Sequence, residues 1–111
     1  MPFSAEVIGG DVAVIRGSGR LNMLTAPRLD MVLQSVIDRG VQKIVIDLTN
    51  IRFLDATGLG AIIRGLKAAR ALGGDLRLAA TGAQPSLVLE TSHVDGLLPS
   101  HQDPHQAFPS S

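Results

Sequence analysis

The residues best suited to chemistry in this chain are Asp55 and Thr57, within the run Asp55-Ala56-Thr57-Gly58. This run follows an apolar stretch and opens a pattern in which apolar residues recur at helical spacing. A helix start carries free N–H groups and partial positive charge, so it accommodates an anion well. We therefore predict that the Thr57 hydroxyl lies at or near a helix N-terminus, where a phosphate can be added and removed.

The same pair also has a purely structural interpretation. Either Asp55 or Thr57 can cap the helix by accepting a hydrogen bond from a free N–H group, a contact worth about 1 kcal/mol. Capping does not explain why two small residues, Ala56 and Gly58, flank the hydroxyl. We interpret the small neighbours as leaving the hydroxyl open to the active site of another protein.

Other kinds of functional site fit this sequence poorly. Gly58-Leu59-Gly60 follows a strand and opens a helix, but the third glycine of a dinucleotide-binding loop would fall at Ile63. His101 and His105 have a metal-ligand spacing, yet Pro104 interrupts any helix across both. No Gly-x-Ser-x-Gly motif is present. We predict a protein that is not an enzyme, with no catalytic residue, no metal site and no cofactor.

The composition indicates one small domain and excludes several kinds of partner. The chain has 111 residues, of which 45% are hydrophobic, enough for one real core. A formal net charge of +0 and 3% aromatic residues argue against nucleic acid. Cysteine is absent, and neither a signal peptide nor an apolar run near the ~20 residues of a membrane span is seen. We expect a soluble cytoplasmic protein with no membrane contact, either a monomer or a weak homodimer.

The apolar spacing and the turn residues predict alternating strands and helices. A hairpin is expected from strands over 3–8 and 12–16, ending at Gly17-Ser18-Gly19. Thr25 should cap the first helix, with Pro27 in its first turn and Gly40 as its stop. The remaining expected elements are a central strand over 43–48, a helix over 57–72, a strand over 76–80, a short helix over 85–91, a brief strand at 97–98 and a helical turn over 103–108.

The order β-β-α-β-α-β-α predicts an α/β fold with a mixed sheet of four to five strands. The second helix should bury one apolar stripe formed by Leu59, Ile62, Ile63, Leu66 and Ala69. Its opposite face carries Arg64, Lys67 and Arg70. This basic face is either simply solvated or a contact for an acidic partner, and both interpretations stay open.

The segment from Ile46 to Gly60, which reads IDLTNIRFLDATGLG, resembles the signature of STAS domains. It is most similar to the stand-alone anti-sigma-factor antagonists of bacteria, which carry Asp-Leu-x-x-(apolar)-x-(apolar)-(apolar)-Asp-Ser/Ala-Ser/Thr-Gly-Leu. The flanking runs Gly19-Arg20-Leu21-Asn22, Ala26-Pro27 and Gly73-Gly74-Asp75-Leu76 match in the same order. The resemblance implies a STAS fold with helices mainly on one face of the sheet, as a single domain over 1–108 with a frayed tail over 109–111.

What the resemblance implies functionally is a partner switch that controls transcription. In that family the unmodified antagonist binds an anti-sigma factor, itself a serine/threonine kinase, and thereby frees the sigma factor. The kinase phosphorylates the hydroxyl before the motif glycine, here Thr57, and a metal-dependent serine/threonine phosphatase reverses the step. The residues expected to bind the partner are Arg20, Asn22, Asp55, Ala56, Thr57, Gly58, Leu59 and Arg64.

Two residues depart from the commonest family pattern. Thr57 stands where Ser is more familiar, a substitution that the family admits, and Asn22 stands where many members have Asp. Asn keeps the shape of Asp without its charge, so the resemblance does not carry over a contact that needs an anion there. Two other functions stay open: a non-enzymatic scaffold or transporter-associated STAS subunit that binds an ATPase, and a small-ligand or nucleotide binder.

Overall fold

The computed structural model describes residues 3–108, which form one mixed five-stranded sheet in the order β1-β2-β3-β4-β5. The strand β1 (Ser4–Ile8) pairs antiparallel with β2 (Val12–Leu21), as the predicted hairpin requires. The strands β3 (Lys43–Leu54), β4 (Asp75–Ala79) and β5 (Ser100–His101) follow in parallel. The predicted mixed α/β class is therefore confirmed, while the expected frayed tail over 109–111 lies outside the described residues.

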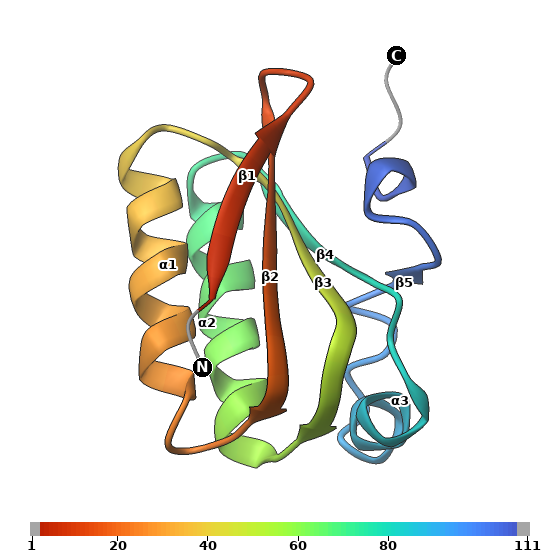
Figure 1. The fold of residues 1–111 in the computed structure, drawn as a ribbon. Coiled ribbons are helices and arrows are strands. Elements are labelled where there is room, and N and C mark those ends of the chain that lie inside the picture. Colours follow the sequence, from red (N-terminus) through yellow and green to blue (C-terminus); the bar gives the residue numbers. More distant parts are fainter. Residues whose placement is uncertain (1–2, 109–111) are drawn as a thin grey trace.

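Three helices connect the parallel strands: α1 (Ala26–Asp38), α2 (Ala56–Ala71) and α3 (Ala83–Thr91). The strand order advances in one direction across the sheet, and right-handed crossovers then place every connecting helix on the same face. Figure 1 shows α1 and α2 side by side against the sheet, with α3 near its end. No helix within 3–108 combines the length and the apolar character that a bilayer span requires.

The helix boundaries follow from residues that the sequence makes recognisable. Pro27 lies in the first turn of α1, and Gly40 follows its end with a positive φ of +83°, a conformation that favours glycine. The apolar stripe of α2 faces the core as predicted, with Leu59, Ile62 and Leu66 buried. These side chains pack on Ile44, Ile46 and Leu48 of β3.

The face of the sheet opposite the helices is partly covered by the C-terminal segment. A 3-10 turn, η1 (Pro104–Gln106), begins at Asp103, whose Oδ1 accepts a hydrogen bond from the His105 N–H at 2.9 Å. This bond, together with one from the His105 ring, holds the pKa of Asp103 below its ordinary value. Ala107 follows and is fully buried against the apolar side chains of Val12, Val14, Val45 and Ala79.

Arg77 of β4 fastens this segment to the sheet. Its Nη1 donates a hydrogen bond to the Ala107 carbonyl at 2.6 Å, and its guanidinium lies 4.2 Å from the centroid of the Phe108 ring. The central strand β3 is thus covered on both faces, as its nearly continuous apolar run predicts.

Three sequence predictions about strands are wrong. The strand β2 does not end at Gly17-Ser18-Gly19 but continues to Leu21, and β3 continues past Leu48 to Leu54. These extensions pair with each other across two register shifts, so tertiary pairing overrides the turn preference of the glycines. The last strand lies at Ser100–His101 rather than at 97–98, because the carbonyl of Pro99 and residues 100–101 pair with β4.

Candidate functional site

Thr57 occupies the first turn of α2, where its side chain is exposed. The helix begins at Ala56, one residue before the predicted start. This end of α2 lies beside the C-terminal ends of β2 and β3 and the start of α1, at the lower end of the view in Figure 1. The hydroxyl therefore stands on the rim of the sheet, within reach of another protein.

Asp55 is the residue that caps α2. Its backbone is extended, and its Oδ1 accepts a hydrogen bond from the Gly58 N–H at 2.8 Å. This bond satisfies one of the free donors at the start of the helix. Because Asp55 caps the helix, helix capping does not explain why a hydroxyl-bearing residue stands exposed at position 57.

Gly58 fits a space that admits no side chain. A β-carbon there would stand 2.3 Å from the carbonyl oxygen of Leu21, far inside contact distance. The N–H of Asp55 also donates to that carbonyl, at 3.2 Å. The absence of a side chain at Gly58 thus has a steric reason besides access to Thr57: the start of α2 rests on the end of β2.

Gln84 of α3 holds the strand that leads into the site. The Leu54 N–H donates to Gln84 Oε1 at 2.8 Å, and Gln84 Nε2 donates to the Leu54 carbonyl at 3.0 Å. The side-chain amide therefore pairs with both backbone groups of the last β3 residue, as a further strand would. No sequence pattern connects residues thirty positions apart in this way, so Gln84 is not among the residues predicted for the site.

Asn22 shapes the loop between β2 and α1. Its Oδ1 accepts hydrogen bonds from the Leu24 N–H at 3.0 Å and the Thr25 N–H at 3.3 Å. Because an amide oxygen makes these bonds without a charge, Asn suits the turn as well as Asp would. The turn leaves the side chains of Met23 and Leu24 exposed at 68% and 78%.

Thr25 precedes α1 as predicted, but its side chain does not cap the helix. Its hydroxyl instead donates to the Arg20 carbonyl at 2.8 Å and accepts from the Asn22 N–H at 3.0 Å. The predicted side-chain cap is therefore wrong, because the Thr25 hydroxyl is already hydrogen-bonded to two backbone groups of the preceding turn.

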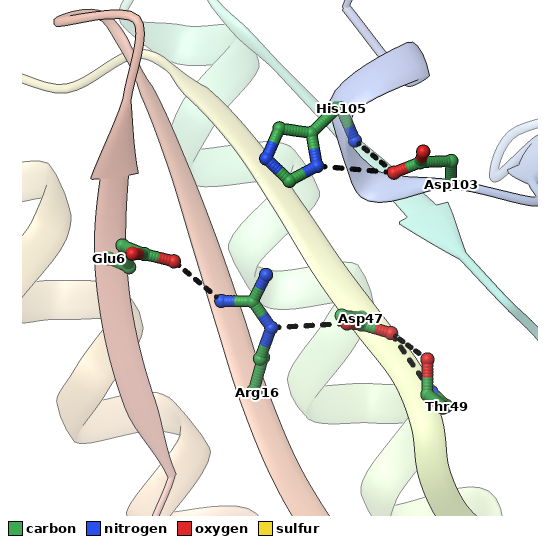
Figure 2. Close-up of polar contacts among 6 residues, drawn as sticks. All are labelled: Glu6, Arg16, Asp47, Thr49, Asp103 and His105. Atoms are coloured by element: carbon green, nitrogen blue, oxygen red, sulfur yellow. Dashed lines mark hydrogen bonds and ion pairs between the residues drawn. The ribbon is translucent and has the colours of Figure 1, made fainter.

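Asp47 is a second aspartate of the signature segment, and it lies on the sheet face opposite the helices. Figure 2 shows its carboxylate between Arg16 and Thr49, with Glu6 on the far side of Arg16. Asp47 Oδ2 accepts from Arg16 Nε at 3.2 Å, and Asp47 Oδ1 accepts from the Thr49 N–H at 3.0 Å. Its side chain satisfies a backbone donor where the β2–β3 register shifts, so Asp47 supports the course of β3 toward the site.

The eight residues expected to bind a partner fall into three groups by exposure. Arg20, Ala56, Thr57 and Arg64 are exposed, Asp55 and Asn22 are half-buried, and Gly58 and Leu59 are buried. Arg20 lies over the Phe53 ring, 5.8 Å from its centroid. The exposed residues offer a surface, whereas Gly58 and Leu59 hold the start of α2 in place, and a partner contact by any of the eight stays a prediction.

The basic face of α2 is less charged than its sequence indicates. Arg64 pairs with Asp30 of α1 at 2.9 Å, and Arg70 pairs with Asp75 at 3.2 Å. Lys67 between them is exposed. Two of the three cations thus already have an acidic neighbour within the chain.

The sequence of this chain matches that of a known protein family. The family model of the STAS domain matches residues 3–107, which is nearly all of the chain. This chain is a STAS domain.

Among curated proteins, this STAS domain is similar to the anti-sigma-B factor antagonist of Staphylococcus aureus (strain NCTC 8325 / PS 47), with 35% identity over 54 residues. The match spans 49% of this chain and 50% of that protein, so it covers about half the length of each.

Solved structures extend the likeness to nearly the whole STAS domain. An anti-sigma factor antagonist from Mycobacterium paratuberculosis superposes with a TM-score of 0.80 and 25% identity, covering 91% of this chain and 85% of that one. The Bacillus cell fate determinant SpoIIAA in its phosphorylated form gives a TM-score of 0.71 at 19% identity, covering 88% and 89%. SpoIIAA has also been solved as an anti-sigma factor antagonist in its unphosphorylated form, with a TM-score of 0.70 at 20% identity, covering 91% and 87%. These likenesses confirm the STAS fold predicted from the signature segment.

Proposed function

We propose that this STAS domain is an anti-sigma factor antagonist whose docking to an anti-sigma factor kinase is switched by phosphorylation of Thr57. The observation that carries the proposal is the exposed Thr57 hydroxyl in the first turn of α2, beside a cap that Asp55 already provides. The curated relative is named as such an antagonist, and SpoIIAA exists in phosphorylated and unphosphorylated forms. A metal-dependent phosphatase would restore the binding form.

The physical effect of a phosphate differs between folding and binding. A phosphate adds about −1.5 to −2 charges, which a helix N-terminus stabilises by about 0.3–1 kcal/mol, so the fold should persist. Burying that charge in an interface without a matching cation costs several kcal/mol. Since about 1.4 kcal/mol is a tenfold change in affinity, association should fall by orders of magnitude. Modification would thus act on docking and leave the domain folded.

The test compares binding by two variants of the acceptor. We expect Thr57→Ala to bind the cognate anti-sigma factor kinase as the parent chain does, and Thr57→Glu to bind about a hundredfold less tightly. Affinity is measured by calorimetric titration of the kinase. Incubation with the same kinase and ATP should place the phosphate on Thr57, as located by mass spectrometry.

A matched control separates the site from a general charge effect. Thr91→Glu places the same new charge on an exposed threonine at the end of α3 and should leave the affinity unchanged. Equal affinity of Thr57→Ala and Thr57→Glu would contradict the proposed switch.

A further inference from the structure

The guanidinium of Arg64 reaches back along α2 toward Thr57. A β-carbon at Gly60 would stand 3.4 Å from Arg64 Nη1, so the guanidinium lies beside the Gly60 turn. Side chains on a helix lean toward its N-terminus, which explains this position. The positive charge of Arg64 therefore sits about one turn nearer to Thr57 than the backbone of Arg64 does.

Thr57, Gly60 and Arg64 lie on one face of α2. Seven residues make almost two helical turns, so Thr57 and Arg64 point in nearly the same direction. β-Carbons three residues apart on a helix are about 5–6 Å from each other, which sets the spacing between positions 57 and 60. From the Gly60 turn the flexible guanidinium can swing further toward a phosphate on the Thr57 hydroxyl, because glycine at position 60 places no side chain between them.

Arg64 is held at present by an acidic residue that a phosphate can outcompete. Its Nε and Nη2 donate to the carboxylate of Asp30 on α1, with distances from 2.9 to 3.3 Å. The two side chains are 58% and 39% exposed, so water screens the pair and its contribution is small. A phosphate carries more charge than a carboxylate and accepts a forked pair of hydrogen bonds from arginine.

We propose that Arg64 exchanges partners when Thr57 is phosphorylated, leaving Asp30 and binding the phosphate. The exchange breaks the ionic link between α1 and α2 and partly neutralises the phosphate in the free protein. This inference rests on Thr57 as the phosphorylated residue, as proposed above, and adds an internal cation that holds the phosphate. Asp30 and the phosphate then compete for Arg64, so a stronger Asp30–Arg64 pair means weaker binding of the phosphate by Arg64.

The test uses the full chain with phosphothreonine incorporated at position 57 during translation, and follows the phosphate by phosphorus NMR across its second pKa, ordinarily about 6. A cation close by favours the dianion and lowers this pKa. We expect the pKa in the parent chain to lie about half a unit below that in Arg64→Gln, the size typical of an exposed ion pair. Asp30→Asn, which removes the competitor, should lower the pKa below that of the parent chain.

Two control variants separate this pairing from the general field of the protein. Lys67→Gln removes an exposed cation from the same helix, and Arg20→Gln removes one from the end of β2; both should leave the phosphate pKa at the value of the parent chain. Equal shifts in Arg64→Gln and Lys67→Gln, or a larger shift in Arg20→Gln, would overturn the proposal. As a second measurement, the Arg64 Nε resonance should move when the parent chain carries phosphothreonine, and a resonance unchanged by the phosphate would also overturn it.

The outcome is independent of the proposed partner switch. Phosphothreonine is installed without a kinase and no partner is present, so the titration reports only the contact between Arg64 and the phosphate. If the phosphorylated chain still bound the kinase at full affinity, the partner switch would fail while the exchange at Arg64 could be measured as before.

Discussion

A single carbonyl oxygen, that of Leu21, positions the start of α2. It accepts a hydrogen bond from the Asp55 N–H at 3.2 Å, and it lies only 2.3 Å from the place that a β-carbon at Gly58 would take. The exposed threonine between these two residues is therefore placed by backbone contacts rather than by its own side chain. Gly58 is required by the fold whether or not any partner binds.

Alanine should have opposite effects on stability at two glycines of the same helix. Gly58→Ala should lower the free energy of unfolding by about 1–3 kcal/mol, because the methyl group meets the Leu21 backbone. Gly60→Ala should raise it by up to about 1 kcal/mol, because alanine favours helix and its β-carbon meets only the flexible end of Arg64. Urea denaturation measures both values, and equal stability of the two variants would contradict the steric role of Gly58.

At the scale of elements, the site depends on how α3 and β2 hold the end of β3. The last residue of β3, Leu54, has both backbone groups bonded to the side chain of Gln84. The same end of β3 pairs with the end of β2, where Leu21 lies opposite Leu54. Three elements, α3, β2 and β3, thus meet at the junction that leads from β3 into the first turn of α2, where Thr57 lies.

Removing the Gln84 amide should loosen the junction between β3 and α2. Gln84→Ala leaves the backbone N–H and C=O of Leu54 without partners, and we expect a loss of about 1–3 kcal/mol in unfolding free energy. Faster amide hydrogen exchange should appear at residues 54–58. The control Glu90→Ala changes an exposed residue of the same helix and should leave both measurements unchanged, so a similar effect of the two variants would contradict this role of Gln84.

Local periodicity predicts the helices of this fold well, because their apolar stripes and stop signals lie within one segment. The buried residues Leu29, Leu33 and Val36, and the positive φ at Gly40, could all be anticipated. The continuation of β2 through Gly17 and Gly19 could not, because it is stabilised by pairing with β3 rather than by residues nearby.

Within the candidate site, too, features set by neighbouring residues could be predicted and long-range contacts could not. The position of Thr57 at a helix start follows from the local pattern, whereas the contacts of Gly58 with Leu21 and of Gln84 with Leu54 join segments far apart in the chain. One sequence supplies no signal for such long-range contacts, and the side-chain role of Asn22 emerges only from the loop that it forms.

For the whole molecule, the two faces of the sheet are covered in different ways. Helices α1 and α2 pack on one face over the main core, while a short segment around Ala107 closes part of the other. That segment is held through Arg77, which bonds the Ala107 carbonyl and lies over Phe108. The covering of this second face of the sheet therefore depends on few contacts.

Two arginines offer a matched test of this closure, since Arg70 and Arg77 both pair with Asp75. Arg77→Ala should lower the unfolding free energy by about 1–2 kcal/mol and speed hydrogen exchange over residues 104–108, because it also loses the Ala107 and Phe108 contacts. Arg70→Ala loses only an exposed ion pair and should change stability by less than about 1 kcal/mol. Equal exchange rates in the two variants would show that Arg77 does not hold the segment.

The close contact between Gly58 and the Leu21 backbone limits how the sequences of homologous proteins with different partners can diverge at this site. Because no methyl group fits there, any side chain at position 58 would push the start of α2 away from β2 and displace Thr57. Changes that alter which partner is recognised are instead confined to exposed side chains away from this contact, such as Met23 and Leu24 in the adjoining loop. Across homologues, the residues at these exposed positions should vary with the partner, while position 58 should remain glycine.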